Sequence, residues 1–259
     1  MGAAKDIGAA LVTGGESGIG RACAIALAEA GRDIAILYFR DRAAAEETAA
    51  SVGAAGRRAA CVQADVGDEA AVEAAFDAAI AALGTVDCLV NSAGLNMSGV
   101  TVADMELAQW RRLIATDLDG VFLTSRRFVR DAHAHETGGS IVNISSIHAV
   151  DVRAGGADYC AAKAGMKALT ETMALEEAPH GITVNCVAPG MILTPMNARA
   201  LTDESYRRSL EANVPAGRAG TPEEVAGLVA FLASPAARYI NGATLTIDGA
   251  LSLLLAQGA

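Results

Sequence analysis

"AALVTGGESGIGRACAIALAEAG", residues 9–31, joins an apolar run to a glycine-rich turn and then to a long alanine-rich segment. The apolar run predicts a buried strand, and the segment after the turn predicts a helix. Glycine is needed where a chain turns sharply and lets a ligand approach its backbone. Backbone amides and the helix dipole at such a turn can face a pyrophosphate, so the stretch indicates nucleotide binding. The spacing is GxxxGxG and not GxGxxG, and glycines also end strands for ordinary turn reasons.

Further apolar runs alternate with helical periodicity along the chain. We expect strands at residues 33–38, 58–63, 86–91, 140–145, 182–188 and 243–248, in addition to the one at 9–13. Between two of them, Val72, Phe76, Ile80 and Leu83 form one apolar helical stripe. This alternation predicts right-handed crossovers and a parallel sheet covered on both faces. The expected fold is α/β: a single-domain, Rossmann-like, doubly wound parallel sheet of about seven strands with helices on both faces.

One domain is expected to span residues 1–259. The alternation of strands and helices is interrupted once, at about residues 190–220. That part holds Pro195, Pro215 and Gly217, which interrupt regular structure. We interpret it as a substrate flap with a short polar helix over the edge of the sheet, and not as a linker between domains.

Composition argues against several classes of partner. Lysine and arginine number 20 against 30 aspartates and glutamates, and the net charge of −10 disfavours nucleic acid or an anionic membrane surface. The five scattered cysteines indicate neither a disulfide framework nor a metal site. No apolar run approaches the roughly 18 residues of a membrane span, and the first residues show no signal-peptide pattern. We therefore expect a cytoplasmic protein that acts on a small molecule.

Five motifs resemble those of the short-chain dehydrogenase/reductase family in order and in spacing. They are TGxxxGIG at 13–20, NSAG at 91–94, Ser146, YxxxK at 159–163 and PGxxxT at 189–194. SSIH at 145–148, residues 165–185 and DG at 248–249 look most like the bacterial glucose 1-dehydrogenase branch. The resemblance covers nearly the whole chain. It implies an NAD(P)-dependent oxidoreductase that transfers hydride between nicotinamide and a secondary alcohol, a ketone or a sugar.

Tyr159 and Lys163 stand four residues apart, so on a helix both side chains project toward one site. A free phenol has a pKa of about 10, and a neighbouring ammonium or a bound nicotinamide cation stabilises the phenolate. Tyr159 can then exchange a proton with a carbonyl or alcohol oxygen, to which Ser146 can donate a hydrogen bond. The alternative is a core tyrosine beside a lysine that reaches solvent.

Asp117, in the stretch TDLDGVF at 116–122, stands where the resembling family usually has asparagine. In that family the backbone carbonyl of this residue holds a water that links the lysine to solvent, and aspartate still supplies the carbonyl. The carboxylate can also pair with a neighbouring cation and alter the proton relay; a tolerated substitution is the alternative. The candidate catalytic residues are therefore Ser146, Tyr159, Lys163 and Asp117.

The resemblance also implies a set of cofactor-binding residues. They are Gly14, Ser17, Gly18, Ile19, Gly20, Phe39, Arg40, Asp65, Val66, Asn91, Ala93, Gly94, Tyr159, Lys163, Pro189, Gly190, Ile192 and Thr194. Asp65 and Val66 would contact adenine, with a simple strand-end cap as the alternative. Asn91 and its neighbours would line the floor behind the nicotinamide ribose, while Ile192 and Thr194 would meet the carboxamide and phosphates.

The candidate substrate residues are Ser146, His148, Asn96 and Asn197. His148 is in register with the SVH phrase of the glucose dehydrogenase branch. That branch has glutamates where this chain has Asn96 and Ala149, so two carboxylates that can hold sugar hydroxyls are missing. His133, His135 and His180 are expected at the surface.

The end of the second expected strand, LYFRDR at 37–42, bears on the choice of cofactor. An acidic residue there accepts hydrogen bonds from the adenosine ribose and repels a 2′-phosphate. This chain has Phe39 at or near that position, with Arg40 and Arg42 beside it, and arginine suits phosphate. Glu16 and Asp41 favour the opposite choice. We expect NADP(H), with NAD(H) as the alternative.

Two other functions fit the same fold. A non-catalytic dinucleotide-binding regulator would have no need to keep Ser146, Tyr159 and Lys163 together. A 3-oxoacyl-[acyl-carrier-protein] reductase would want a basic surface for its acidic carrier, which a net charge of −10 does not encourage.

A homotetramer is expected from the helices and from the tail. The outer faces of the helices that carry Asp117 and Tyr159 are expected to hold small and apolar residues, such as Ala164, Ala168, Met173 and Ala174. The chain ends in the apolar LSLLLAQGA, residues 251–259. In the resembling family such helices pair across twofold axes, so we expect residues 251–259 to be buried at an interface. A tail folded back on its own subunit is the alternative.

Overall fold

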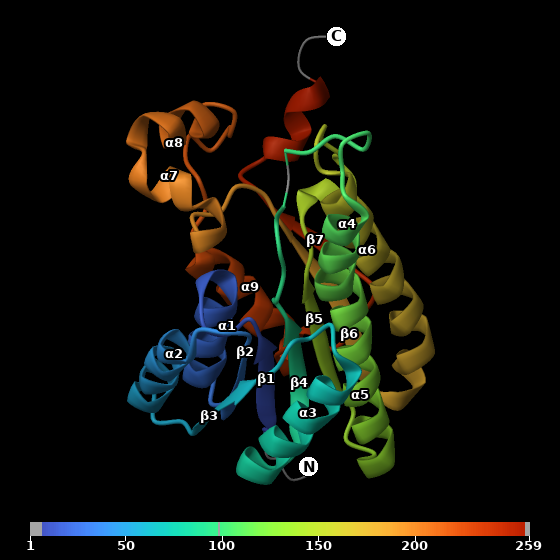
Figure 1. Cartoon of the computed structure of the whole chain (residues 1–259). Helices are drawn as coiled ribbons and strands as arrows, with labels where there is room; N and C mark the ends of the chain where they lie inside the picture. The colour runs from blue at the N-terminus through green and yellow to red at the C-terminus, as the bar shows by residue number, and fades with distance from the viewer. Residues whose placement is uncertain (1–6, 98, 257–259) are drawn as a thin grey trace.

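The computed structural model describes residues 7–97 and 99–256, which form a seven-stranded parallel sheet with helices on both faces (Figure 1). The strand order is β3-β2-β1-β4-β5-β6-β7. The bounds are β1 (Ala9–Thr13), β2 (Ile34–Tyr38), β3 (Ala59–Gln63), β4 (Val86–Asn91), β5 (Gly139–Ile144), β6 (Ile182–Pro189) and β7 (Thr244–Ile247). Each strand lies within one residue of its expected bounds. The doubly wound parallel sheet is confirmed.

Apolar side chains alternate between the two faces of the strands, so each face holds its own layer of helices. Ala10 and Val12 of β1 pack in the layer of α1 (Gly18–Glu29), α2 (Arg42–Ala54) and α9 (Pro222–Leu232). Ala9 and Leu11 pack in the layer of α3 (Glu69–Leu83), α5 (Gly120–His135) and α6 (Ala157–Glu177). A further helix, α4 (Leu107–Ile114), packs against α6. The expected stripe on residues 72–83 faces the sheet from α3.

The strand order reverses between β1 and β4, which is where such sheets form a crevice. The chain leaves β1 toward α1 on one face and leaves β4 toward α5 on the other. A side chain ties the two exits together, because Thr13 Oγ1 accepts hydrogen bonds from the backbone N–H groups of Ser92 and Ala93, both at 3.0 Å. The loops after β1 and β4 therefore lie side by side at the carboxyl end of the sheet.

An ion-pair group holds the opposite end of β2. Asp33 Oδ1 accepts a hydrogen bond from the Arg58 backbone N–H at 3.0 Å and lies 2.9 Å from Arg57 Nη2, while Oδ2 accepts a hydrogen bond from Arg58 Nε at 2.7 Å. Burial acts to raise the pKa of Asp33, but the hydrogen bonds from Arg58 and the charge of Arg57 outweigh it and lower the pKa. The ionised carboxylate therefore stabilises this end of the sheet.

Residues 190–220 leave the sheet beyond its carboxyl end. The sequence predicts one short polar helix here, and the structure has two, α7 (Ala198–Thr202) and α8 (Glu204–Glu211), after a 3-10 turn, η4 (Pro195–Asn197). The chain restarts at α8 because the Asp203 side chain caps it, accepting the Tyr206 N–H at 2.9 Å. Figure 1 shows α7 and α8 standing clear of the sheet.

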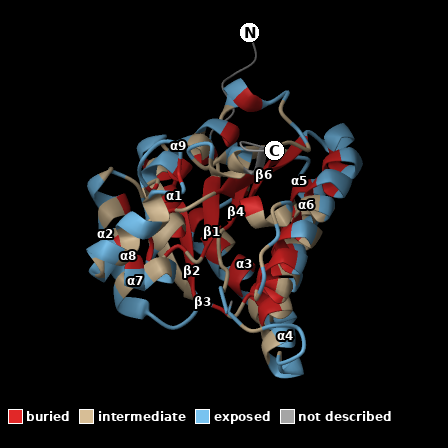
Figure 2. Cartoon of the chain, turned by 90° about the horizontal axis from the view of Figure 1, so that it is seen from above, coloured by how far each residue is buried: buried red, intermediate tan, exposed pale blue. Residues whose placement is uncertain are grey.

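Burial follows the layers, with the central strands fully covered and the outer helix faces exposed (Figure 2). All eight residues of β6 and all five of β1 are buried. The five cysteines are free thiols; Cys61 is half-buried and the other four are buried. Within the described residues, no helix is both long enough and apolar enough to cross a membrane.

Candidate active site

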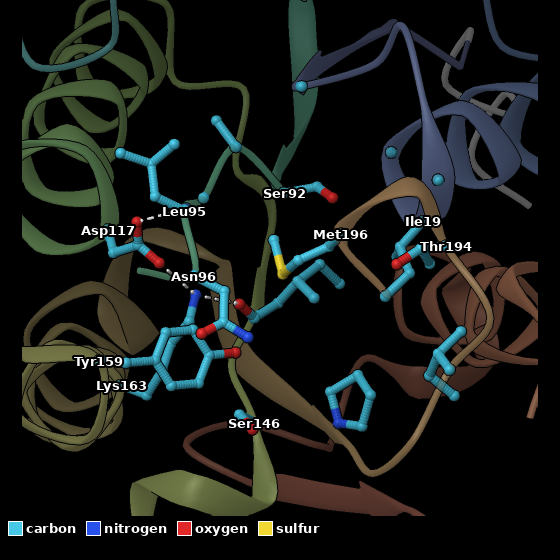
Figure 3. Close-up of a pocket in the computed structure, with 18 of the residues that line it drawn as sticks. Ile19, Ser92, Leu95, Asn96, Asp117, Ser146, Tyr159, Lys163, Thr194 and Met196 are labelled. Carbon is cyan, nitrogen blue, oxygen red and sulfur yellow. Dashed lines mark hydrogen bonds and ion pairs between the residues drawn. The ribbon is translucent and has the colours of Figure 1, made fainter. Parts of the chain in front are cut away.

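A cavity of about 590 Å³ opens at the carboxyl end of the sheet, lined in part by residues between 190 and 220 (Figure 3). That volume is within the range of cofactor and ligand sites. Its lining brings together most of the residues singled out in the sequence: Gly14, Ser17, Gly18, Ile19, Gly20, Phe39, Asp65, Val66, Ala93, Gly94, Asn96, Asp117, Ser146, His148, Tyr159, Lys163, Pro189, Gly190, Ile192, Thr194 and Asn197. Arg40 and Asn91 are the two exceptions.

The turn after β1 leaves the amino end of α1 open toward this cavity. Gly14 and Gly18 have positive φ angles of 63° and 51°, which favour glycine. The Ser17 side chain at the N-cap makes no capping hydrogen bond within the described part of the chain, so the first amides of α1 stay available. Gly20 has no space for a side chain, since a Cβ there would lie 2.1 Å from the Gly14 carbonyl oxygen. An uncapped helix end in a glycine cradle fits the phosphates of a dinucleotide.

The residues after β6 form the wall opposite the glycine turn. A Cβ on Gly18 would lie 3.4 Å from Thr194 Cβ, so the two elements approach to contact distance. Asn197 holds this wall together, because its Nδ2 donates to the Ile192 carbonyl oxygen at 2.8 Å. Figure 3 shows Thr194 across the cavity from Tyr159. The cavity thus runs from the glycine turn to the tyrosine.

Asp65 and Val66 line the end of the cavity near Phe39. Asp65 Oδ2 forms an ion pair with Nη1 of Arg112 at 2.8 Å, while Oδ1 accepts the Gly67 N–H at 3.0 Å. The strand-end cap that was the alternative for Asp65 is therefore present, alongside its place in the lining. Arg112 also lines the cavity, and sequence inspection did not find it.

Arg40 lies beside the lining and not in it. Its guanidinium carbon is 4.6 Å from the centroid of the Phe39 ring, and that of Arg112 is 5.1 Å from the same centroid. Arg42 instead pairs with Glu46 one turn along α2, Nε to Oε1 at 2.7 Å. Arg40 and Arg112 therefore place guanidinium groups near Phe39. Arg42 is the first residue of α2, and its side chain is directed along that helix toward Glu46.

Asn91 was expected to line the floor of the cavity, but it is not among the lining residues. Its buried Nδ2 donates to Ser125 Oγ at 3.1 Å and to Asn143 Oδ1 at 2.8 Å, and its Oδ1 accepts from Thr124 Oγ1 at 2.7 Å. The pleat of β4 turns this side chain toward α5, and the next residue, Ser92, lines the cavity. Asn91 thus belongs to a buried hydrogen-bond network inside the sheet.

Tyr159 and Lys163 project from the first turns of α6 and are both buried. Lys163 Nζ lies 5.5 Å from the centroid of the Tyr159 ring and donates to the carbonyl oxygen of Ile144, at the end of β5, at 3.1 Å. Burial acts to lower the pKa of Lys163, but the charges of Asp117 and Tyr159 raise it above its usual value. The lysine is therefore an ammonium beside the phenol.

Ser146 follows β5 with an extended backbone and lies below Tyr159 in Figure 3. Its Oγ accepts the His148 N–H at 3.1 Å, which leaves the hydroxyl proton for a ligand oxygen. His148 Nδ1 lies 2.7 Å from the Asp151 carbonyl oxygen, and its ring stands edge-on to Tyr159 with centroids 6.3 Å apart. The loop after β5 therefore holds Ser146 and His148 in fixed positions near the phenol.

The lining of the cavity combines apolar and polar side chains. Met191, Met196 and Leu251 supply apolar surface. Arg153 Nη2 donates to Asn96 Oδ1 at 2.9 Å, and the Arg153 guanidinium carbon lies 5.8 Å from the Tyr159 ring centroid. The cavity therefore offers a ligand both kinds of surface.

Known proteins are similar to this chain in sequence and in fold. A family model described as enoyl-(acyl carrier protein) reductase matches residues 13–252. The chain is 40% identical over 243 residues to 3beta-hydroxysteroid dehydrogenase 1 of Eggerthella lenta, and the aligned region covers 94% of this chain and 93% of that protein. It is 36% identical over 248 residues to glucose 1-dehydrogenase 2 of Bacillus subtilis, covering 96% of each. The chain belongs to the short-chain dehydrogenase/reductase family.

A solved member of this family has the same fold. The crystal structure of acetoin dehydrogenase from Enterobacter cloacae matches with a TM-score of 0.89 at 36% identity, and the match covers 98% of this chain and 100% of that one. As a short-chain dehydrogenase/reductase, this chain acts on CH–OH groups with a nicotinamide dinucleotide, NAD or NADP. The relatives are named for a steroid, a sugar and acetoin, so membership defines the reaction and not the substrate.

Asp117 is where this short-chain dehydrogenase/reductase departs from the usual asparagine. It lies fully buried in the π-helical turn η1 (Ala115–Asp119) between α4 and α5. Its Oδ1 accepts the Leu95 N–H at 2.7 Å, and its Oδ2 is 3.3 Å from Lys163 Nζ (Figure 3). Gly94 leaves room for this pair, since a Cβ there would lie 3.0 Å from Oδ2. Burial raises the pKa of the Asp117 carboxyl, and the ammonium opposes that rise.

Sequence reasoning missed two arginines in this family member's cavity. Arg153 lies between Ser146 and Tyr159 in the chain, and that position could have indicated it. Arg112 comes from α4 and carries no motif, so only the packing of α4 reveals it.

Proposed function

We propose that this protein interconverts a secondary alcohol and its ketone with Tyr159 as the acid–base group, Ser146 as the donor to the reacting oxygen and Lys163 as the supporting cation. One observation carries the proposal: these three side chains meet in a cavity that begins at an uncapped glycine turn. A protein that only binds dinucleotide needs the turn without the three side chains. Their presence together therefore favours catalysis.

The residues of this chain move the proton. When bound, a nicotinamide dinucleotide supplies or accepts the hydride. In ketone reduction the Tyr159 hydroxyl donates its proton to the carbonyl oxygen, and in alcohol oxidation the phenolate takes it back. The Lys163 ammonium, 5.5 Å from the ring centroid, stabilises the phenolate. Ser146 donates a hydrogen bond to the same oxygen as negative charge develops on it.

Asp117 acts through Lys163 in this proposal. A carboxylate 3.3 Å from the ammonium partly neutralises it, so less positive charge acts on the phenol than an asparagine would allow. Lys163 then stabilises negative charge on the Tyr159 oxygen less strongly than it would beside an asparagine. Asp117 is thus a positioning residue for the proton transfer.

For the substrate we propose a secondary alcohol or ketone with both apolar and polar parts, with a sugar as the alternative. The apolar methionines and the Arg153–Asn96 pair in the lining support this choice. Glucose is less favoured, because Asn96 and Ala149 replace the carboxylates of the glucose dehydrogenase branch. Measuring NADPH and NADH oxidation, and the reverse, over ketones, hydroxyketones, sugars, steroids and a 3-oxoacyl thioester would decide.

For the cofactor we propose NADP(H). Arg40 forms no ion pair among the residues that the structure describes, and it lies beside Phe39, where an acidic residue would select NAD(H). Glu16 acts against this choice, because it lines the cavity with a buried oxygen, Oε2, that has no hydrogen-bond partner in the described residues. Arg40→Ala should weaken NADPH more than NADH, while Arg42→Ala, whose arginine is paired with Glu46, is the control. Equal losses for both cofactors in Arg40→Ala would contradict a 2′-phosphate role.

Tyr159→Phe tests the catalytic assignment. The change removes only the oxygen that carries the proton, so turnover should fall by about 10²–10⁴-fold while dinucleotide affinity stays the same. Lys163→Ala should reduce both. Tyr239→Phe, at a fully exposed tyrosine, is the matched control and should keep wild-type turnover. Turnover above a few per cent in Tyr159→Phe would remove Tyr159 from the acid–base role.

We also propose a homotetramer. Leu175 of α6 and Leu253 near the chain end are 81% and 70% exposed, which leaves apolar surface for a partner. Two residues expected on the outer face of α6, Met173 and Ala174, are instead buried against the sheet, because the helix is rotated toward its own core there. Residues 257–259, in the tail that we expect at the interface, lie outside the described residues.

A further inference from the structure

Three possible metal ligands lie together at the amino end of the sheet, away from the cavity. His133 is in the last turn of α5, Glu177 is the last residue of α6, and His180 ends the following 3-10 turn, η3 (Ala178–His180). The strands β5 and β6 begin just after these segments. This His–Glu–His cluster is therefore at the opposite end of the strands from Tyr159.

The three side chains already face one another. His133 Nε2 lies 2.7 Å from Glu177 Oε2, and the His133 and His180 ring centroids are 4.1 Å apart with the planes tilted by 39°. One ligand atom from each residue lies within 4.8 Å of the other two. In the part of the chain that the structure describes, no other group of three has this property.

The donor set matches zinc. Two imidazoles and one carboxylate, with the fourth position left for water, are a donor set that zinc accepts in catalytic sites, and tetrahedral ligands about 2.0–2.2 Å from the ion lie about 3.3 Å apart. The 2.7 Å pair of His133 and Glu177 would open by about 0.6 Å, and the widest separation, up to 4.8 Å, would close by about 1.5 Å. Rotations of the exposed histidine side chains supply such movements. Their exposure also admits a water as the fourth ligand.

The local charge favours a cation. The helices α5 and α6 both end at the cluster, and the carboxyl end of a helix carries partial negative charge. Glu177 is only 8% exposed, so its carboxylate is shielded from water and is stabilised by a positive partner. A divalent ion supplies more positive charge there than a protonated histidine does.

We propose that the His–Glu–His cluster binds one Zn²⁺ ion per chain and that the ion clasps the end of α5 to the connection between α6 and β6. The ion stabilises the fold and takes no part in the oxidoreductase reaction, because α6 carries Tyr159 and Lys163 at its other end. This inference does not depend on the proposed catalytic roles.

A calorimetric titration tests the site. The full chain, without a polyhistidine tag and stripped of metal by a chelator, is titrated with zinc chloride, and one site per chain is expected. His133→Ala and His180→Ala should each weaken binding at least about tenfold, since even the loss of an outer-shell partner costs about 10–100-fold. Glu177→Gln should weaken it as well. His135→Ala, at an exposed histidine whose Nδ1 contacts the Asp131 carbonyl oxygen, is the matched control and should bind zinc as the wild type does.

Cobalt spectra and thermal unfolding keep the test decisive if an alanine variant fails to fold. Wild-type protein should raise its Tm on addition of Zn²⁺ and should bind Co²⁺ with a visible absorption typical of nitrogen and oxygen ligands. A thiolate charge-transfer band would place the ion at a cysteine such as the half-buried Cys61 and would overturn the proposal. So would the absence of stoichiometric binding, or unchanged affinity in folded His133→Ala and His180→Ala.

Discussion

Gly20→Ala is the change whose outcome the structure determines most directly. A Cβ at this position, in the first turn of α1, would lie 2.1 Å from the Gly14 carbonyl oxygen and 2.7 Å from its carbonyl carbon. Real Cβ atoms essentially never come within 3.0 Å of such a neighbour, so the oxygen contact must open by about 0.9 Å. Gly14 has little space to move away, because it packs closely against the backbone of Ala93. A Cβ placed on Gly14 would lie only 3.0 Å from Ala93 backbone atoms.

The magnitude follows from this lack of space. Overpacking typically costs about 1–3 kcal/mol and occasionally more. Because both obstacles at Gly20 are backbone atoms, we expect a cost near the upper end, a loss of about 3 kcal/mol in the free energy of unfolding. For a chain of this size the corresponding fall in Tm is about 6–12 °C. The displaced amides of α1 should also weaken dinucleotide binding by more than about tenfold.

The assay is urea unfolding followed by far-ultraviolet circular dichroism, with NADPH affinity measured by calorimetry. Protein concentration is held constant, since the stability of an oligomer depends on it. Gly53→Ala is the matched control: Gly53 is exposed near the end of α2 with nothing within 4 Å of its Cβ position, so alanine should leave stability unchanged or raise it by up to about 1 kcal/mol. A Gly20→Ala protein within about 0.5 kcal/mol of the wild type, with unchanged NADPH affinity, would refute the reasoning.

Three further predictions concern charge and assembly. Asp117→Asn should raise turnover in alcohol oxidation at the acidic end of the pH profile, because the Lys163 ammonium is then no longer partly neutralised by a carboxylate 3.3 Å away; an unchanged profile would mean that this carboxyl carries no charge at the working pH. Asp33→Asn should lower the free energy of unfolding by about 1–3 kcal/mol at pH 7. The pKa of Asp33 is lowered in the folded chain, so its contribution to the free energy of unfolding is present above about pH 4 and is lost as the pH falls. A variant whose free energy of unfolding lies below that of the wild type by the same amount at pH 7 and at pH 2 would contradict this. Deleting residues 252–259 should reduce the mass found by light scattering below that of a tetramer; a wild-type mass of one chain would contradict the assembly, and an unchanged mass in the deletion would exclude the tail from it.

The strands and the cofactor turn could be predicted because their signals are local. A strand buried on both faces requires a short apolar run, and β2, with all five residues buried, is such a run. The positive φ angles at Gly14 and Gly18 are properties of single residues, so the positions of the glycines in the sequence already indicate them.

The catalytic candidates could be predicted for a similar reason. Tyr159 and Lys163 share a helix face at a separation of four residues, whatever surrounds the helix. Their approach to Ser146 follows from the order of β5 and α6 along the chain. The identity of the group beside Lys163 could be suggested from the position of Asp117, but its distance of 3.3 Å could not.

Contacts between distant segments were decided by the tertiary structure. Asn91 was expected in the cavity but is turned toward α5, while Arg112 reaches Asp65 across 47 residues of chain and His133 reaches Glu177 across 44. Short-range pattern alone does not show which neighbour a polar side chain will meet, because the same residue type is compatible with either face of a strand or with several rotations of a helix. The sequence by itself determined the seven strands, their order along the chain and the glycine turn. Strand register and the packing of helices on the sheet selected the partners, because that choice depends on many weak contacts between segments far apart in the chain.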